Sequence, residues 1–241
     1  MSCRLAVADF KNDQEVRWCP GCGDHAILAS VQKAFPLVAE ALGYEKERFT
    51  VISGIGCSSR FPYYVDTFGF HSIHGRATAI STGVKTANPK LSVWQITGDG
   101  DALAIGGNHF IHAVRRNVDI NILLFNNEIY GLTKGQYSPT SKFGAVTKTS
   151  PYGTVERPFI PGQLVIGAKG TFFARSLDVE MALSTEILVE AAKHDGTSVV
   201  EFLQNCVIFN DGAYTNITDK AVRDDRVIYL KHGEPMVFGK N

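Results

Sequence analysis

The sequence predicts an α/β fold in which a doubly wound, mostly parallel sheet is covered by helices. Two observations lead to this prediction. Four short apolar runs of strand composition alternate with segments of helical periodicity, which is typical of parallel sheets. The chain has 241 residues and is 44% hydrophobic, so it can bury one large core. We therefore expect residues 1–241 to form a single domain.

The first predicted helix follows Asp24, a residue type that often caps helices. Its apolar residues recur at helical spacing and form one face: Ile27, Val31, Phe35, Val38 and Leu42. Strands are predicted at Phe49–Ser53, Leu91–Thr97, Ile120–Phe125 and Ser198–Leu203. Further helices are predicted at Ala77–Ala87, Gly107–Arg116 and Val179–His194, and one more is expected to start after Gly100.

Three segments stand apart from this alternation. Residues 15–25 contain two closely spaced cysteines. Residues 131–162 are rich in Gly, Ser, Thr, Pro and Lys, and a connection of that length in a compact domain is usually functional or binds a partner. Residues 219–241 form a short C-terminal extension of mixed charge.

The charge balance disfavours two classes of ligand. Lys+Arg and Asp+Glu both number 24, whereas a protein that binds nucleic acid or a membrane surface usually carries a basic excess. The N-terminus does not resemble a secretory signal, and no segment approaches the roughly 18 apolar residues of a membrane span. We expect a cytoplasmic protein, in which the five cysteines serve metal or redox chemistry in place of disulfides.

Polar or cysteine-containing turns follow all four predicted strands. These turns are Gly54–Ser59, Gly98–Asp101, Asn126–Gly131 and Gln204–Cys206. Ligands of open parallel sheets bind at the carboxyl ends of the strands. The four turns are therefore expected to form one crevice.

Two of these turns carry oxygen ligands of the kind that Mg²⁺ prefers. Asp99 lies between Gly98 and Gly100, which allow the backbone to approach a ligand closely. Asn127 follows the next strand, and carboxylate, amide and carbonyl oxygens suit Mg²⁺ together with phosphate. Either motif alone is usually an ordinary turn. Together they resemble the diphosphate-binding signature of thiamine-dependent enzymes, in which Asp99, Asn127 and the carbonyl of Ile129 would hold Mg²⁺.

Four cysteines are candidates for one metal site. Cys19 and Cys22 lie in one short loop, whereas Cys57 and Cys206 follow strands at the predicted crevice. Four thiolates suit either zinc or an iron–sulfur cluster, and spacing alone does not separate the two. Taken singly, Cys57 or Cys206 would be interpreted as an inert buried cysteine. Cys3 is interpreted as a bystander near the terminus.

Five motifs, in order along the chain, resemble those of the β subunit of 2-oxoacid:ferredoxin oxidoreductases. They are Trp18–His25, Gly54–Arg60, His74–Ala77, Gly98–Asp101 and Asn126–Gln136. The resemblance covers about residues 17 to 210 and is greatest to the 2-oxoglutarate (2-oxoglutarate synthase) type. Many members of this family continue further than Asn241, so the chain is either short or lacks its tail.

The resemblance implies a thiamine-diphosphate-binding fold, Mg²⁺, and a [4Fe–4S] cluster held by Cys19, Cys22, Cys57 and Cys206. It implies that thiamine diphosphate attacks the keto carbon of a 2-oxoacid, carbon dioxide leaves, and electrons pass singly through the cluster to ferredoxin while coenzyme A takes the acyl group. This chain offers no candidate for the carboxylate that the aminopyrimidine ring requires. The resemblance assigns that carboxylate and the coenzyme A site to an α subunit, without which the chain is expected to be inactive.

The residues expected to contact the cofactor lie in these turns and in the motifs His74–Ala77 and Asn126–Gln136: Cys57, Ser58, Ser59, His74, Gly98, Asp99, Gly100, Asp101, Asn127, Ile129, Gly131, Leu132 and Thr133. Two residues are given catalytic roles. Arg60 is expected to clamp the distal carboxylate of 2-oxoglutarate, and His74 to approach the cofactor. The ordinary alternatives are a solvated charge for Arg60 and a merely hydrogen-bonded ring for His74.

Three other interpretations stay open. The chain could belong to a pyruvate-type ferredoxin oxidoreductase, to a non-reductive thiamine enzyme with a structural zinc site, or to a zinc-stabilised scaffold with a vestigial crevice. The four cysteines count against the second interpretation. The intact Gly-Asp-Gly and Asn-Asn motifs count against the third.

Overall fold

A parallel sheet is the frame of the molecule. The computed structural model describes residues 4–237 and Gly239, so Cys3 lies outside the described residues. Six strands follow the order β2-β1-β3-β4-β8-β7, and every neighbouring pair is parallel. The strands are β1 (Phe49–Ser53), β2 (Phe68–His71), β3 (Ser92–Gly98), β4 (Asn121–Asn126), β7 (Phe172–Leu177) and β8 (Ser198–Leu203). A separate antiparallel pair joins β5 (Ile129–Tyr130) and β6 (Gln136–Tyr137).

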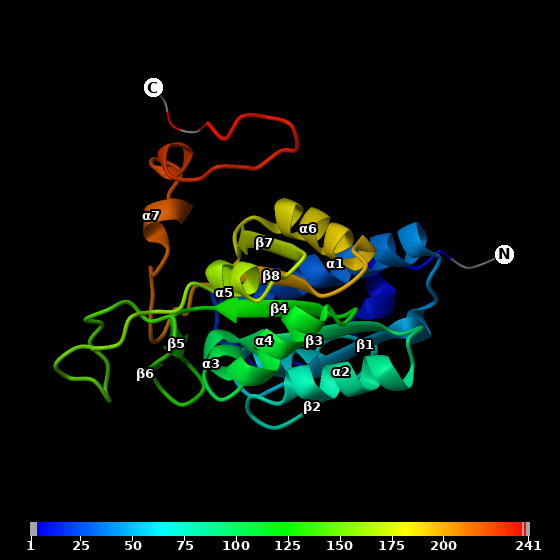
Figure 1. Ribbon diagram of the computed structural model, residues 1–241, viewed down its shortest axis with the longest axis horizontal. Coiled ribbons are helices and arrows are strands. Elements are labelled where there is room, and N and C mark those ends of the chain that lie inside the picture. Colours follow the sequence, from blue (N-terminus) through cyan, green and yellow to red (C-terminus); the bar gives the residue numbers. More distant parts are fainter. Residues whose placement is uncertain (1–3, 238, 240–241) are drawn as a thin grey trace.

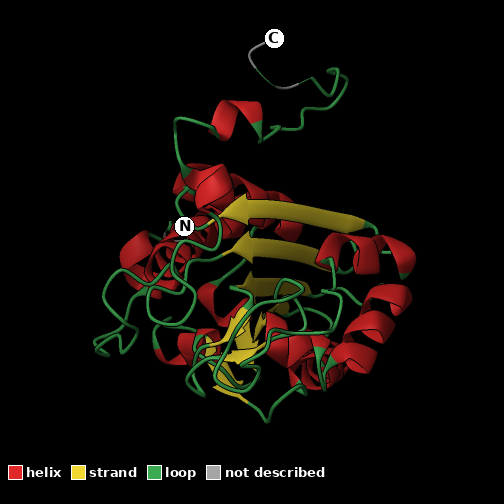
Figure 2. Ribbon diagram, turned by 90° about the vertical axis from the view of Figure 1, so that its left-hand side faces the viewer, coloured by secondary structure: helices red, strands yellow, loops and turns green. Residues whose placement is uncertain are grey.

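Helices cover both faces of this sheet (Figure 2). They are α1 (Asp24–Leu42), α2 (Ala77–Ala87), α3 (Asp99–Leu103), α4 (Gly107–Arg116), α5 (Pro161–Gly167), α6 (Met181–Lys193) and α7 (Thr215–Thr218). Helices α1 and α6 pack against each other over one face, and α2, α4 and α5 lie over the other. The chain after α7 runs away from the sheet (Figure 1). Among the described residues, no helix combines the length and hydropathy that a bilayer crossing requires.

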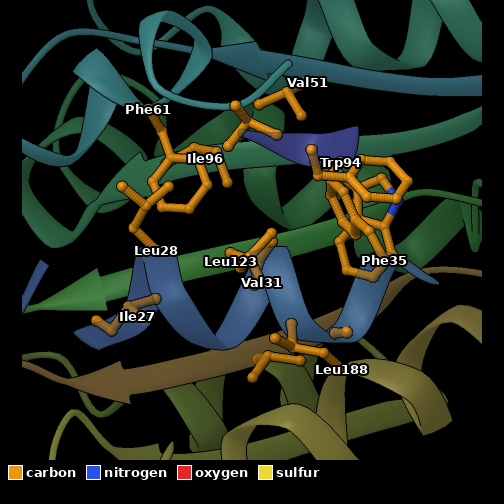
Figure 3. Close-up of a cluster of buried hydrophobic side chains, with 14 of the residues drawn as sticks. Ile27, Leu28, Val31, Phe35, Val51, Phe61, Trp94, Ile96, Leu123 and Leu188 are labelled. Atoms are coloured by element: carbon orange, nitrogen blue, oxygen red, sulfur yellow. The ribbon is translucent and has the colours of Figure 1, made fainter. Parts of the chain in front are cut away.

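Two apolar cores fill the spaces between the sheet and its helices. Successive side chains of a strand point to opposite faces, and strands covered on both faces are apolar throughout. Val51, Ile96 and Leu123 face α1 (Figure 3), whereas Ile52 and Ile122 belong to the core on the opposite side. All five side chains are fully buried. The packed core holds the strands in fixed positions, so the residues that follow the strand ends are held in fixed positions as well.

Phe35 lies at the centre of the larger core. Its ring centroid is 5.0 Å from that of Trp94 on β3 and 4.8 Å from that of Phe49 on β1. Phe10 completes the group at 5.3 Å. The apolar face of α1 is thus fastened to two strands at once (Figure 3).

The structure confirms the predicted fold class and most of the predicted elements. β1, β8, α2 and α4 have the predicted bounds, β3 and β4 lie one residue further along the chain, and α6 is shorter than predicted at both ends. Six helices and strands of the described chain were missed. All four residues of β2 are exposed at the sheet edge, β7 contains the charged Arg175, and the other four are the short elements β5, β6, α5 and α7.

The prediction that Asp24 caps the first helix is wrong. Asp24 is the first residue of α1, and its carboxylate is only 1% exposed. The side chain interacts with Cys22 instead of capping the backbone. Because the Asp24 side chain is buried beside Cys22, helix α1 begins without a side-chain cap.

We predict that Phe35→Ala lowers the free energy of unfolding by about 3–5 kcal/mol, because it opens a cavity between three aromatic rings. Urea unfolding followed by circular dichroism measures the loss. Leu37→Ala is the matched control on the same helix, since Leu37 is 45% exposed, and its effect should stay within about 0.5 kcal/mol. Equal losses in the two variants would contradict the proposed centre of the core.

Candidate functional site

The turns at the carboxyl ends of β1, β3 and β4 enclose a cavity of about 480 Å³. Every residue expected to contact a cofactor lines it except Ser59, whose backbone carbonyl accepts a hydrogen bond from Ser53 Oγ. Ile55, Gly56, Phe125, Tyr130 and Gln136 complete the wall. The topology thus brings together turns that lie far apart in the sequence.

Asp101 ties three of these segments together from inside the protein. Its Oδ1 accepts hydrogen bonds from the backbone N–H groups of Gly75, at 2.7 Å, and Ile55, at 3.1 Å. Thr97 Oγ1 donates to Oδ2 at 2.6 Å. A Cβ added to Gly54 would lie 1.9 Å from the same carboxylate, so only glycine permits this approach. Asp101 therefore shapes the cavity wall, in addition to lining it.

His74 and Tyr130 stand beside this carboxylate. His74 Nδ1 lies 3.0 Å from Asp101 Oδ1, and its ring centroid is 6.1 Å from that of Tyr130. The Tyr130 hydroxyl donates to the carbonyl of Gly100 at 2.9 Å. Burial, with the negative charges of Asp99 and Asp101, raises the pKa of Tyr130 to about 12, so the phenol stays protonated at neutral pH.

Asp99 is held by hydroxyl groups from the segment 131–162. Ser138 Oγ donates to Asp99 Oδ2 at 2.6 Å, and Thr140 Oγ1 donates to the same oxygen at 2.5 Å. Burial raises the pKa of Asp99 to about 6, although both hydroxyl bonds oppose that shift. A bound cation would favour the ionised form of such a carboxylate, so Asp99 fits the role of a magnesium ligand.

Asn127 follows β4 and folds back on its own backbone. Its Oδ1 accepts a hydrogen bond from the N–H of Ile129 at 3.1 Å. Its Nδ2 donates to Gln204 Oε1 at 2.9 Å, and its carbonyl accepts from Asn210 Nδ2 at 2.9 Å. Asn127 and Ile129 line the same cavity as Asp99, so the donor set of carboxylate, amide and backbone carbonyl suits Mg²⁺.

A chain of polar groups, all buried except Arg175, supports the Asp99 carboxylate. Arg175 pairs with the fully buried Glu201 at 2.7 Å, and Glu201 Oε1 accepts from Asn126 Nδ2 at 2.8 Å. Asn126 Oδ1 in turn lies 2.9 Å from Thr140 Oγ1, whose single hydroxyl hydrogen is donated to Asp99. Because each group has a partner, the network fixes the position of the Asp99 carboxylate.

The four candidate cysteines surround a second cavity, of about 210 Å³: Cys19, Cys22, Cys57 and Cys206. The N-terminal pair is brought there by Trp18, whose Nε1 donates to the carbonyl of Cys57 at 2.6 Å. In the described part of the chain, no three His, Cys, Asp or Glu side chains converge closely enough to hold a single metal ion. The four thiols instead line a cavity that has room for a group larger than a single ion.

The chemistry of this second cavity fits a metal–sulfur group. A Cβ built on Gly131 would lie 3.5 Å from Cys57 Sγ and 3.6 Å from Cys206 Sγ, so glycine keeps the space beside these sulfurs open. Burial raises the pKa of the Cys57 thiol to about 12 and also raises the pKa of Cys22. Metal coordination deprotonates such thiols, and all four residues could hold an iron–sulfur cluster.

Two charged groups complete the wall of the cysteine cavity. Burial raises the pKa of Asp24 to about 7, and its Oδ1 has no hydrogen-bond partner among the described residues. Arg60 lines this cavity and an adjoining hollow with Arg17 and Tyr63. Its charge opposes the rise in the pKa of Cys57. Arg60 is not among the described residues around the larger cavity, and its substrate contact stays a prediction.

The two cavities share part of their walls. Four residues line both: Cys57, Asn127, Gly131 and Leu132. The shared wall places the candidate thiol ligands directly beside the candidate diphosphate site. Sequence reasoning identified the candidate ligands but missed the residues that position them or the adjoining cavity wall, namely Ser138, Thr140, Tyr130 and Gln204. Only Tyr130 and Gln204 carried a signal, because they lie in the turns after β4 and β8.

Comparisons with known proteins show which family the chain resembles. Residues 54–202 match the family model described as "Thiamine pyrophosphate enzyme, C-terminal TPP binding domain". The chain is 58% identical over 233 residues to 2-oxoglutarate oxidoreductase subunit KorB of Mycobacterium tuberculosis, which covers 97% of this chain and 61% of that protein. It is 47% identical to 2-oxoglutarate synthase subunit KorB of Archaeoglobus fulgidus, over 78% of this chain and 69% of that one.

A solved structure is similar as well. The 2-oxoglutarate:ferredoxin oxidoreductase from Magnetococcus marinus, solved with 2-oxoglutarate, coenzyme A and succinyl-CoA bound, gives a TM-score of 0.81 at 40% sequence identity. The match covers 86% of this chain and 70% of that chain. The present chain therefore spans about two thirds of the length of these relatives.

We predict that Asp101→Ala lowers the free energy of unfolding by about 3 kcal/mol, because it leaves the N–H groups of Ile55 and Gly75 unpaired inside the protein. Chemical denaturation measures the loss. Asp119→Ala is the matched control, since Asp119 is half-exposed and pairs with Lys85 near the surface, and it should change stability by less than about 1 kcal/mol. An Asp101 variant as stable as the control would contradict the role of this carboxylate in joining the turns.

Proposed function

Since this chain belongs to the β-subunit family of 2-oxoacid:ferredoxin oxidoreductases, we propose that it catalyses the oxidative decarboxylation of 2-oxoglutarate together with an α subunit. In the proposed reaction 2-oxoglutarate and coenzyme A give succinyl-CoA and carbon dioxide, and the electrons released reduce ferredoxin one at a time. The names of the relatives support 2-oxoglutarate over pyruvate as the substrate.

The observation that carries this proposal is the wall shared by the two cavities. A thiamine enzyme that transfers no electrons to an acceptor would need only the larger cavity. Here Cys57 and Gly131 face both spaces, so a group held by the thiols would lie next to one held by Asp99 and Asn127. Electron transfer between neighbouring groups requires such proximity.

Each set of residues has a distinct task in the proposal. Asp99, Asn127 and the carbonyl of Ile129 hold Mg²⁺ and, through it, the diphosphate. Cys19, Cys22, Cys57 and Cys206 hold the [4Fe–4S] cluster. When bound, thiamine diphosphate supplies the decarboxylation chemistry and the cluster supplies the one-electron carrier. The protein contributes placement and charge.

The acidic residues of the larger cavity support the need for a partner. They are Asp99, which is held by two hydroxyl groups, and Asp101, which accepts two backbone N–H groups and one hydroxyl. Neither is left for the aminopyrimidine ring of thiamine. We therefore assign that carboxylate to the α subunit, and we propose that the α subunit also provides the coenzyme A site.

Anaerobic purification with the α subunit tests the proposal. We expect about four iron and four sulfide per chain, and thiamine-dependent reduction of ferredoxin by 2-oxoglutarate and coenzyme A. The chain without its partner should be inactive. About one zinc without sulfide would instead make the cysteines a structural site and reject the redox function.

We further predict that Gly131→Ala lowers the iron and sulfide content of the complex several-fold, because the new methyl group would occupy part of the cavity beside Cys57 Sγ and Cys206 Sγ in which the cluster is proposed to lie. Iron and acid-labile sulfide assays measure the loss. Gly83→Ala is the matched control, because a Cβ at Gly83 meets no atom within 4 Å. Full loading of both variants would place the cluster elsewhere.

A further inference from the structure

Gln204 joins the two cavities through a single side chain. It is 1% exposed and follows β8 directly. Its Nε2 donates to Cys22 Sγ at 3.3 Å, and its Oε1 accepts from Asn127 Nδ2 at 2.9 Å. One buried amide thus contacts a candidate cluster ligand on one side and a candidate magnesium ligand on the other.

The strand register explains how the amide reaches both residues. β4 and β8 are parallel, and Asn126 pairs with Leu203 at their carboxyl ends. The next residues along the two strands are Asn127 and Gln204, which therefore lie side by side. The backbone N–H of Gln204 donates to the carbonyl of Asn126 at 2.9 Å, which fixes the start of the turn.

The amide has little freedom to rotate. A primary amide offers two hydrogens and one oxygen for hydrogen bonds. The second donor bond of Nε2 goes to the carbonyl of Asn205 at 2.5 Å, and that carbonyl also accepts from the N–H of Gly23, beside Cys22. Turning the amide over would place its N–H groups against Asn127 Nδ2 and its oxygen against a sulfur and a carbonyl.

On the premise of the proposed function, we propose that Gln204 is a positioning residue that couples the iron–sulfur cluster to the magnesium–diphosphate site. Its N–H group stabilises the more negative, reduced cluster through the sulfur of Cys22, which raises the reduction potential. Its oxygen holds the Nδ2 side of Asn127, which fixes the orientation of the Asn127 amide toward the cavity. A movement of Asn127 is transmitted to Cys22 through one rigid group.

The decisive variants separate the two contacts. Gln204→Met removes both contacts at similar volume. Gln204→Glu keeps an oxygen for Asn127 Nδ2 but removes the donor to Cys22 Sγ. Gln95→Met is the matched control, because Gln95 is a fully buried glutamine in β3 whose Nε2 binds Thr78.

Each variant is measured in the complex with the α subunit. An EPR-monitored redox titration gives the potential of the cluster, and binding of Mg²⁺–thiamine diphosphate to cofactor-depleted protein gives the dissociation constant. For Gln204→Met we expect roughly tenfold weaker cofactor binding and a cluster roughly tenfold harder to reduce, about 59 mV for one electron. For Gln204→Glu we expect the lowered potential with cofactor affinity close to that of the wild type. Gln95→Met should change neither.

The outcomes separate this inference from its premise. A wild-type complex without iron and sulfide would reject the proposed function, and the inference with it. A loaded wild-type cluster, with potential and affinity both unchanged in Gln204→Met, would reject the inference alone. A change in only one of the two quantities in Gln204→Met would also reject it, because the amide would then serve one site and couple nothing.

Discussion

The site depends on one buried carboxylate, that of Asp101. Strand ends in a parallel sheet are joined to their helices by separate turns, and nothing in the sheet itself holds these turns against one another. Asp101 does so by accepting hydrogen bonds from N–H groups in the turn after β1 and in the segment before α2, and from the hydroxyl of Thr97 on β3. Hydrogen bonds to a charged acceptor in a buried place are strong, and their loss leaves unpaired donors. Asp101 also lines the larger cavity, so these hydrogen bonds fix the position of part of the cavity wall.

A second constraint acts on the ligands themselves. The chain is formally neutral, yet the two cavities concentrate groups that become negative when ionised: Asp24, Asp99, Cys22 and Cys57. Burial raises the pKa of each of these groups. Bound metal ions would reverse these shifts, because a cation favours the ionised form. Asp99 is therefore well suited to hold Mg²⁺, and Cys22 and Cys57 are suited to hold iron.

The supporting shell has the character of a rigid polar network. The line from Arg175 on β7 passes through Glu201 on β8, Asn126 on β4 and Thr140, and ends at Asp99 at the start of α3. Gln204 makes a similar link between the two cavities. Such networks hold functional groups in place because each member is satisfied only in one arrangement. The segment 131–162 takes part through Ser138 and Thr140, which gives this long connection a structural task.

The local sequence determined the elements and the chemistry of the site. Periodicity identified α1, α2, α4 and the central strands, because a strand or helix face buried in a core must be apolar at regular spacing. The residue types at the strand ends pointed to magnesium and metal–sulfur ligands, because ligand preference belongs to the side chain itself.

Only the tertiary structure decided what holds these residues. Ser138 and Thr140 reach Asp99 across some forty positions of chain, and Gln204 meets both Asn127 and Cys22, contacts that no local pattern encodes. Asp24 shows where a local pattern misleads. Its place before an apolar helix predicted a helix cap, but its carboxylate is buried beside the cysteines. Burial is set by neighbours that are distant in sequence, so the local pattern could not predict it.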